Sequence, residues 1–297
     1  MATHRGDDLE DDFVLDEIVA YSDEEADSGL GDGEDVGHLL SADEGEAAVT
    51  SKAKDEKQLE KKRKRKEKLR EKKVKRRKLE DESATSLPIA AQSPAAIAEY
   101  FANMQAKVFP KSTALELQDR SIPESSIADT TSWKGSRSLE DLEEFIMQAV
   151  PSLHTRLSQR TRSPGAPTML FVVSAAMRGA DATRALRSKK LRGEKGGDVA
   201  KLFAKHFKLE QQVAFLKKTK VGSAVGTPAR LGKLLNDTDA LSISALTHIV
   251  LDISHKDAKN FDVLEIPQTR DEVFKAVLGA PEVLRGIRAG KITVVLF

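Results

Sequence analysis

The sequence predicts an α/β fold: a mostly parallel sheet in a three-layer sandwich, preceded by a disordered N-terminal tail. Three observations support it. From residue 169 onward, short continuous apolar runs, which are typical of strands buried on both faces, alternate with amphipathic stretches. Strands that alternate with helices form right-handed crossovers and parallel pairs. The first 92 residues carry too few apolar side chains to form a core, so we expect the folded domain to cover residues 93–297.

The first 92 residues divide by charge into two segments. Net charge over the 297 residues is +1, yet Arg5 is the only lysine or arginine in the acidic stretch 1–50. We predict that 1–50 is a disordered acidic tail, either solubilising or carrying a linear docking motif at residues 13–21. Residues 51–92 are predicted to be disordered or a solvated helix, because good helix formers occur there without an apolar stripe.

The basic segment contains a dense block of lysine and arginine. Such blocks are typical of nuclear localisation signals and nucleic-acid contacts, since cations release the counterions condensed on phosphates. The alternative is a charged helix exposed to solvent. We assign nuclear localisation or RNA contact to Lys61, Lys62, Arg63, Lys64, Arg65, Lys66, Arg76, Arg77 and Lys78.

The elements of the domain follow from periodicity and from glycine and proline breaks. A helix is expected at 95–109, and Ser138 is expected to cap a second helix that buries Phe145. Strands are expected at 169–173, 212–216, 221–225, 246–252 and 292–297. Further helices are expected at 175–191, 228–235, 269–278 and 282–287, and another runs from a cap at Asp198 to Phe207 with His206 on its packed face.

The composition excludes several kinds of function. The chain has no cysteine, so disulfides, thiolate metal sites and cysteine nucleophiles are excluded. No apolar stretch approaches the ~20 residues of a membrane span, and we expect no membrane partner. Asp252, His255 and Asp257 lack the spacing of a standard metal site, and Ser254 with His255 forms no ordered nucleophile and base. We therefore predict no metal, no cofactor and no catalytic residue.

The most informative stretch is Val225–Leu231, which reads Val-Gly-Thr-Pro-Ala-Arg-Leu. A strand there leads into a glycine, a threonine at the cap position and a proline at the first helical position. Such a helix start presents unpaired N–H groups and a positive dipole end, which suit a phosphate. Further along, Asp252 follows the apolar run His248–Leu251, at the end of a strand where open α/β sheets bind their ligands.

In order and spacing, the segments Ser174–Arg178, Val225–Leu231 and Ile249–His255 resemble the first RecA-like domain of DEAD-box RNA helicases. The resemblance implies a RecA-like domain that contacts the RNA sugar-phosphate backbone, with Ala229 in place of a family glycine. The residues that match the RNA-contacting motifs are Arg178, Gly226, Thr227, Pro228 and Arg230. The alternative is that Thr227 and Pro228 only begin a helix.

Nearly the whole chain is similar to the family of subunits of the 90S pre-ribosomal complex that contains the U3 small nucleolar RNA. The similarity rests on the acidic and then lysine-rich N-terminus, on residues 115–125 and on residues 201–206. It implies a protein of the nucleus and nucleolus that acts in small-subunit assembly. The partners it implies are pre-ribosomal RNA or the U3 small nucleolar RNA, together with small-subunit pre-ribosomal proteins.

The motifs needed for ATP hydrolysis are incomplete. Phosphoryl transfer by P-loop proteins requires a glycine-rich loop that ends in Gly-Lys-Ser/Thr, and here Lys134-Gly135-Ser136 has the inverted order. Asp252 matches the first aspartate of the helicases' acidic motif, but Ile253 replaces the glutamate that orients water. We expect a degenerate helicase-like, non-catalytic RNA- and protein-binding factor. The alternatives are a nucleotide-binding or weak ATPase helicase-like enzyme that uses Asp252, and a scaffold that binds only proteins.

Overall fold

The structure is a computed structural model that describes residues 87–205 and 207–297. The predicted acidic tail, the basic tract from Lys61 to Lys78 and His206 lie outside these residues. The described part begins with a short 3-10 helix, η1 (Ile89–Ala91), whose Ala90 is buried in the core. Among the described residues, no helix is long and apolar enough to span a bilayer.

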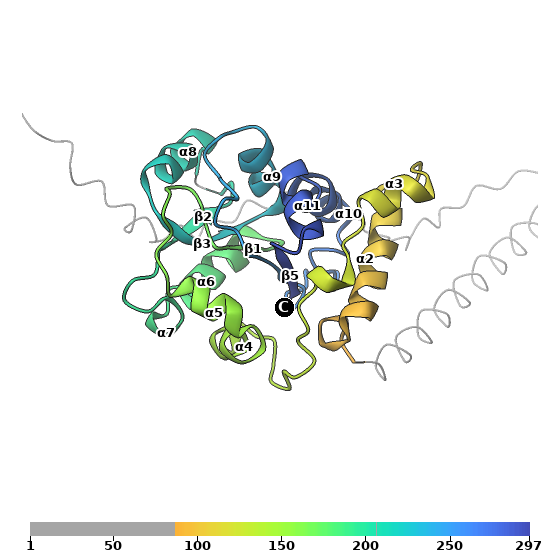
Figure 1. Ribbon diagram of the computed structural model, residues 1–297, viewed down its shortest axis with the longest axis horizontal. Coiled ribbons are helices and arrows are strands. Elements are labelled where there is room, and N and C mark those ends of the chain that lie inside the picture. The colour runs from red at the N-terminus through yellow and green to blue at the C-terminus, as the bar shows by residue number, and fades with distance from the viewer. Residues whose placement is uncertain (1–86, 206) are drawn as a thin grey trace, which may run out of the picture. The chain divides into compact units, whose positions relative to one another are not determined.

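Five parallel strands form one sheet in the order β2-β3-β1-β4-β5. The strands are β1 (Met169–Val172), β2 (Asp198–Leu202), β3 (Val221–Gly226), β4 (His248–Leu251) and β5 (Thr293–Leu296). On the central strand, Phe171 lies opposite Val225 of β3 and Val250 of β4. Strands β2 and β5 form the two edges of the sheet. The predicted α/β class with a parallel sheet between helices is confirmed (Figure 1).

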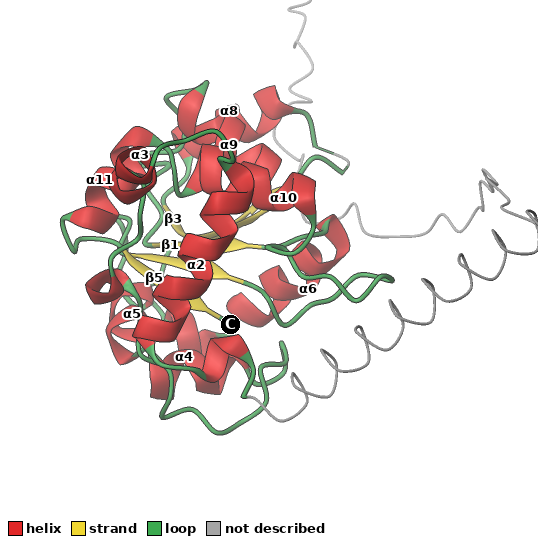
Figure 2. Ribbon diagram, turned by 90° about the vertical axis from the view of Figure 1, so that its right-hand side faces the viewer, coloured by secondary structure: helices red, strands yellow, loops and turns green. Residues whose placement is uncertain are grey.

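Each strand buries both of its faces, as the continuous apolar runs predict. On β1, Leu170 and Val172 belong to one core, whereas Met169 and Phe171 belong to the other. The first core is covered by α2 (Pro94–Val108), α8 (Leu209–Lys218), α9 (Pro228–Asn236), α10 (Pro267–Glu272) with its π-helical extension Val273–Val277, and α11 (Pro281–Arg288). The second is covered by α4 (Leu142–Ala149), α5 (Pro151–Leu157), α6 (Ala176–Leu186) and α7 (Lys189–Arg192). Figure 2 shows the sheet between these two layers.

Local capping chemistry explains where several helices begin. Ser93 precedes α2 with an extended backbone, its Oγ accepts a hydrogen bond from the Ala96 N–H, and Pro94 occupies the first helical position. The short helix α3 (Ala114–Asp119) begins with a capping box between Thr113 and Glu116. Ser138 was expected to cap α4, but the helix starts at Leu142, and Ser138 instead hydrogen-bonds Asp141 in the preceding turn.

Two predictions of secondary structure are wrong: one predicted helix is a strand, and one predicted strand is part of a helix. The segment that begins at Asp198 is strand β2 rather than a helix, because it pairs in parallel with β3 from Val199 to Leu202. The segment 212–216 is part of helix α8 rather than a strand. Gln212 and Leu216, four positions apart, face the core, and their spacing is helical although the intervening residues are apolar. Both segments are short, so their periodicity is ambiguous without their neighbours.

His248 at the start of β4 is a buried titratable group. Its Nδ1 lies 2.8 Å from Thr247 Oγ1 and its Nε2 lies 3.3 Å from Ser152 Oγ. Burial, helped by the positive charge of Arg156, lowers the pKa of His248 to about 4. The histidine is therefore neutral in the fold at pH values where the unfolded chain would protonate it.

We expect His248 to make folding stability depend on pH. Its pKa is lower in the folded than in the unfolded state, so its contribution is complete above about pH 6.5 and is lost as the pH falls toward 4, by about 3 kcal/mol. The free energy of unfolding, measured in urea at pH 7 and pH 4, should therefore fall less between the two pH values in His248→Gln than in the wild type. In His255→Gln it should fall as much as in the wild type. Burial raises the pKa of Asp262 to about 6, so this residue changes the free energy of unfolding with pH in the opposite direction. Because Asp262 is present in every variant, its contribution cancels in the comparison. An equal change in the free energy of unfolding between pH 7 and pH 4 in the wild type and in His248→Gln would contradict this role of His248.

Candidate nucleic-acid interface

The residues predicted to contact RNA lie at one edge of the sheet. Gly226 ends β3, Arg178 lies in the first turn of α6 after β1, and the register places Val172 of β1 opposite Gly226. Asp252 follows β4, the other neighbour of β1. The carboxyl ends of these three strands therefore gather Arg178, Asp252 and the segment that begins at Gly226, as the parallel sheet predicts.

Arg178 and Asp252 form a buried ion pair at this edge. Arg178 Nε donates to Asp252 Oδ2 at 2.7 Å, and its Nη2 donates to Oδ1 at 3.3 Å. The Asp252 side chain is fully buried, and that of Arg178 is 15% exposed. Ser254 completes the cluster, because its Oγ donates to Asp252 Oδ1 at 2.7 Å and accepts from Arg178 Nη2 at 2.8 Å. The guanidinium predicted to contact RNA is thus bound to a carboxylate within the chain.

This arrangement determines what Asp252 can do. Both of its carboxylate oxygens accept hydrogen bonds from protein groups, and the arginine neutralises its charge. A carboxylate that binds a metal ion in P-loop proteins must instead be available to the ion or its water ligands. Among residues 87–205 and 207–297, no group of three His, Asp or Glu side chains is placed to hold a metal ion.

Gly226, Thr227 and Pro228 form the turn from β3 into α9. A Cβ atom at Gly226 would lie 2.5 Å from the carbonyl oxygen of Leu202, so the glycine permits close packing against β2. Thr227 has the extended backbone of a cap residue, but its side chain makes no capping hydrogen bond; this corrects the expectation of a capping threonine. Pro228 occupies the first helical position and is buried. Of the three, only Thr227 is partly exposed.

Arg230 is also engaged within the chain. Its Nη1 donates to Gln212 Oε1 of α8 at 3.1 Å, and its Nη2 donates to the carbonyl oxygen of Phe207 at 3.3 Å. Gln212 in turn donates to the carbonyl oxygens of Lys201 and Phe203, within and just after the end of β2. Partial burial lowers the pKa of Arg230 from its usual value. The side chain therefore connects α9 to the segment that follows β2.

A second set of residues lies at the same edge of the sheet, and the sequence did not identify them as part of the site. The loop from Asp129 to Arg137 contains Lys134-Gly135-Ser136, the segment with the inverted order of a P-loop ending. The Trp133 ring packs against Gly135 and donates from Nε1 to the Ser136 carbonyl oxygen. Arg137 donates to the carbonyl oxygens of Ala90 and Leu296 at 2.7 and 3.0 Å. Burial lowers the pKa of Arg137 to about 10. A lone arginine between serines carries no motif that could have identified this role.

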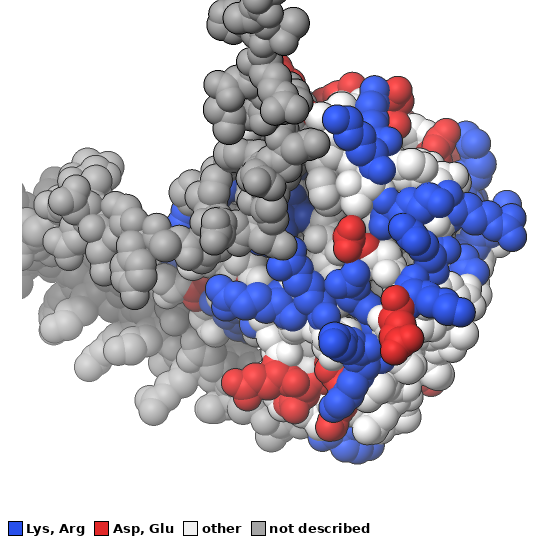
Figure 3. Space-filling model, turned by 90° about the vertical axis from the view of Figure 1, so that its left-hand side faces the viewer, with Lys and Arg blue, Asp and Glu red and all other residues white. Residues whose placement is uncertain are grey.

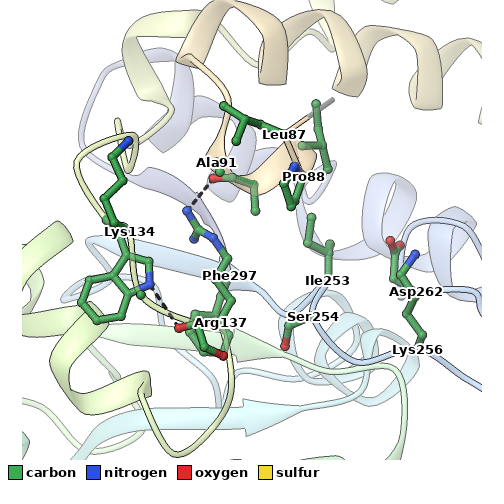
Figure 4. A pocket seen from close by; sticks show the side chains of 15 residues that line it. Leu87, Pro88, Ala91, Lys134, Arg137, Ile253, Ser254, Lys256, Asp262 and Phe297 are labelled. Atoms are coloured by element: carbon green, nitrogen blue, oxygen red, sulfur yellow. Dashed lines mark hydrogen bonds between the residues drawn. The ribbon is translucent and has the colours of Figure 1, made fainter. Parts of the chain in front are cut away.

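These residues border a cavity of about 560 Å³ beyond the ends of β4 and β5. Figure 4 shows Arg137, Ser254 and Phe297 around it, with Pro88 and Ala91 of the N-terminal segment on the opposite side. The cavity is lined by apolar side chains and by the charged residues Lys134, Arg137, Lys256 and Asp262. The volume of the cavity lies in the range of small-molecule sites.

We expect the Arg178–Asp252 pair to be needed for stability. Arg178→Met leaves a fully buried carboxylate without its cation. This change should lower the free energy of unfolding, measured in urea, by about 3–5 kcal/mol. Asp252→Asn in the same chain should recover part of the loss, because it removes the unpaired charge. Arg184→Met on the same helix breaks the exposed pair with Asp181 and should cost less than about 1 kcal/mol. Equal losses in the two methionine variants would show that Asp252 does not depend on Arg178.

Comparison with solved structures gives limited similarity to DEAD-box proteins. The DEAD box protein of the hyperthermophile Methanococcus jannaschii is 15% identical, with a TM-score of 0.34 over 55% of this chain and 37% of that chain. The yeast DEAD-box splicing factor Prp28 is 13% identical, with a TM-score of 0.37 over 55% of this chain and 35% of that chain. This chain thus spans well under half of each.

Comparison of sequences is more informative. Protein CMS1 of Chaetomium thermophilum is 37% identical over 202 residues, which cover 68% of this chain and 78% of the relative. Protein CMSS1 of Homo sapiens is 30% identical over 161 residues, about half of each chain. The family model of the U3-containing 90S pre-ribosomal complex subunit CMS1 matches residues 44–297. Because that match covers most of the chain, this protein belongs to the CMS1 family of 90S pre-ribosomal complex subunits.

Proposed function

We propose that this protein is a non-catalytic, nucleolar RNA- and protein-binding factor of small-subunit assembly. Family membership supports a role in the 90S pre-ribosomal complex. The observation that carries the non-catalytic part is the buried Arg178–Asp252 pair. The side chain that matches a metal-associated aspartate is used inside the fold, where its partner is an arginine.

The loop next to this pair supports the same conclusion. A P-loop holds phosphates with backbone N–H groups, a lysine and a hydroxyl that binds Mg²⁺. Here the Trp133 ring packs against Gly135 of the loop from Asp129 to Arg137, and the Arg137 guanidinium donates to backbone carbonyl oxygens. Lys134 Nζ donates to the Thr131 carbonyl oxygen at 2.9 Å. In a P-loop, the lysine instead extends from a glycine-rich loop toward the phosphates.

RNA binding is supported by charge and by the position of the helix start after β3. The lysine- and arginine-rich tract between Lys61 and Lys78 suits the phosphate backbone, and such contacts supply affinity without reading sequence. Thr227 and Ala229 are accessible at the start of α9, while Arg178 and Arg230 hold the surrounding segments in place. We propose that pre-ribosomal RNA or the U3 small nucleolar RNA is the ligand and that the folded domain also docks on small-subunit pre-ribosomal proteins.

A second candidate function is nucleotide binding, and the cavity is the observation that favours it. Its volume of about 560 Å³ is sufficient for a nucleotide-sized ligand. Lys134 and Lys256 offer positive charge at its wall, and Ser254 lies next to Asp252. Weak ATP hydrolysis by a helicase-like enzyme would use this space.

Calorimetry separates the two candidates. We expect full-length protein titrated with Mg-ATP to give no binding heat at micromolar concentrations, because the aspartate and the lysine loop are engaged within the chain. The matched control is Lys134→Gln, which removes an exposed charge from the cavity wall and should leave the titration unchanged. Micromolar binding in the wild type that disappears in Lys134→Gln would support the nucleotide-binding alternative.

The basic tract supplies the test of RNA binding and location. Replacing the lysines and arginines between Lys61 and Lys78 by glutamine should disperse the protein from nucleoli and reduce the slope of log affinity against log salt concentration, since fewer counterions are released. A variant in which lysine and arginine are exchanged for one another keeps the charge and should keep both properties. The proposal fails if location and salt slope are unchanged by neutralisation. If ultraviolet irradiation of cells crosslinks no RNA to this chain, the protein-only scaffold is the better description.

A further inference from the structure

The charge of the folded domain is concentrated in one part of the chain. Residues 156–220 contain sixteen lysines and arginines but only four acidic residues. The remaining described residues contain fourteen basic and eighteen acidic residues. Residues 156–220 supply α6, α7, β2 and α8, and β2 is an edge strand. Figure 3 shows the corresponding side of the molecule, where lysine and arginine side chains gather in a broad band.

Three segments of this region meet at the amino ends of β2 and β3. Thr161 Oγ1 donates to the Val221 carbonyl oxygen at 3.2 Å, and the Asp198 N–H donates to the Lys220 carbonyl oxygen at 3.2 Å. A Cβ atom at Gly196 would lie 2.8 Å from the carbonyl oxygen of Leu157, so this glycine permits close approach of the two segments. Segments 158–165, 193–198 and 217–222 are therefore held together by backbone hydrogen bonds and by the Thr161 hydroxyl.

These segments carry five exposed cations that we call the basic rim. The basic rim consists of Arg160, Arg162, Lys195, Lys218 and Lys220. In the described part of the chain, none of the five side chains forms a hydrogen bond or ion pair, in contrast to Arg192, which pairs with Asp198 at 3.2 Å, and Lys217, which pairs with Asp239 at 2.9 Å. Five unpaired like charges on adjoining segments repel one another and attract a polyanion.

Protection of the sheet edge does not explain these residues. Edge strands carry lysine to prevent pairing with another chain, and on β2 that role falls to Lys201. The residues of the basic rim lie in the loops that precede β1, β2 and β3 and at the end of α8, outside the strand residues whose hydrogen bonds need protection. Another explanation is therefore required for its charge.

We propose that the basic rim binds the phosphate backbone of RNA, a contact that rests on the proposed RNA-binding function and adds a surface to it. The large apolar side chains that are exposed in the described part are Leu87, Leu115, Met177 and Phe261, and none belongs to the three segments. Protein interfaces have an apolar or aromatic core, whereas phosphate binding requires only accessible cations. The absence of such a core in the three segments favours RNA over a protein partner.

The basic rim is separate from the edge that holds Arg178 and Thr227. Parallel strands place their amino ends together at one end of the sheet and their carboxyl ends at the other, roughly 16 Å away for a strand of five residues. An RNA that contacts both ends would pass along the β2 edge. The carboxyl edge would then position the RNA, while the basic rim would add salt-dependent affinity.

Salt-dependent binding by the full-length chain tests the basic rim. The rim variant replaces five residues by glutamine: Arg160→Gln, Arg162→Gln, Lys195→Gln, Lys218→Gln and Lys220→Gln. The control variant removes the same charge from exposed side chains elsewhere that also have no described partner: Lys111→Gln, Lys233→Gln, Lys259→Gln, Arg285→Gln and Lys291→Gln. Both should keep the wild-type melting temperature, because the replaced side chains are exposed and make no hydrogen bonds.

We expect the rim variant to bind a fluorescent single-stranded RNA at least tenfold more weakly than the control at 0.1 M salt. The slope of log affinity against log salt concentration should become shallower by about 0.7 for each phosphate that the protein no longer neutralises, and by up to about 3.5 for all five cations. Ultraviolet crosslinking of the wild type should also yield RNA-linked peptides from the three segments.

Three outcomes would overturn the inference, and they can be told apart. If the wild type binds no RNA, the proposed function and the basic rim both fail. If the wild type binds RNA but the two variants weaken binding equally, only the basic rim fails. If carbodiimide links carboxylates of residues 1–50 to Lys195, Lys218 or Lys220 and these links persist with RNA bound, the acidic segment of the chain is the occupant and RNA is not.

Discussion

The buried ion pair between Arg178 and Asp252 is the interaction on which the carboxyl edge of the sheet depends. It joins the helix after β1 to the end of the neighbouring strand β4, and Ser254 completes the hydrogen bonding of the carboxylate. A carboxylate in the interior is tolerated only when its charge is compensated. The pair therefore stabilises the edge and at the same time occupies the side chain that phosphate chemistry would need. The same contact therefore underlies both the packing at this edge and our proposal that the protein is non-catalytic.

A division of roles follows for a member of the 90S pre-ribosomal complex family. At the carboxyl edge, arginines are held by partners within the chain: Arg178 by Asp252, Arg230 by Gln212 and Arg137 by backbone carbonyl oxygens. Such groups shape a surface and contribute little free charge. The basic rim, a cluster of five cations without a described partner, lies instead at the amino ends of β2 and β3. Shape and charge thus lie on different parts of one domain, which is compatible with the proposed docking and RNA binding.

Much of the fold was predictable because strands buried on both faces leave a strong signal. The apolar runs at 169–173, 221–225 and 246–252 all became strands, and their parallel pairing followed from the helices between them. The exchange of types at Asp198–Leu202 and 212–216 occurred where only a few residues carried the pattern. At the candidate site, the sequence identified Arg178 and Arg230 but not their partners. Arg137 left no signal, since its role depends on the carbonyl oxygens of Ala90 and Leu296, which distant segments bring to it.

The sequence by itself determined the α/β class and the order of most elements, because periodicity and chain direction are local properties, and it singled out Arg178, Gly226 and Asp252. Only the tertiary structure decided what those residues do. Whether an arginine is free for a phosphate or bound to a carboxylate depends on which side chain lies across from it. Here Asp252 lies 74 positions away in the chain from Arg178 and 2.7 Å away in space. Contacts of that kind are set by packing of the whole domain, and no local pattern encodes them.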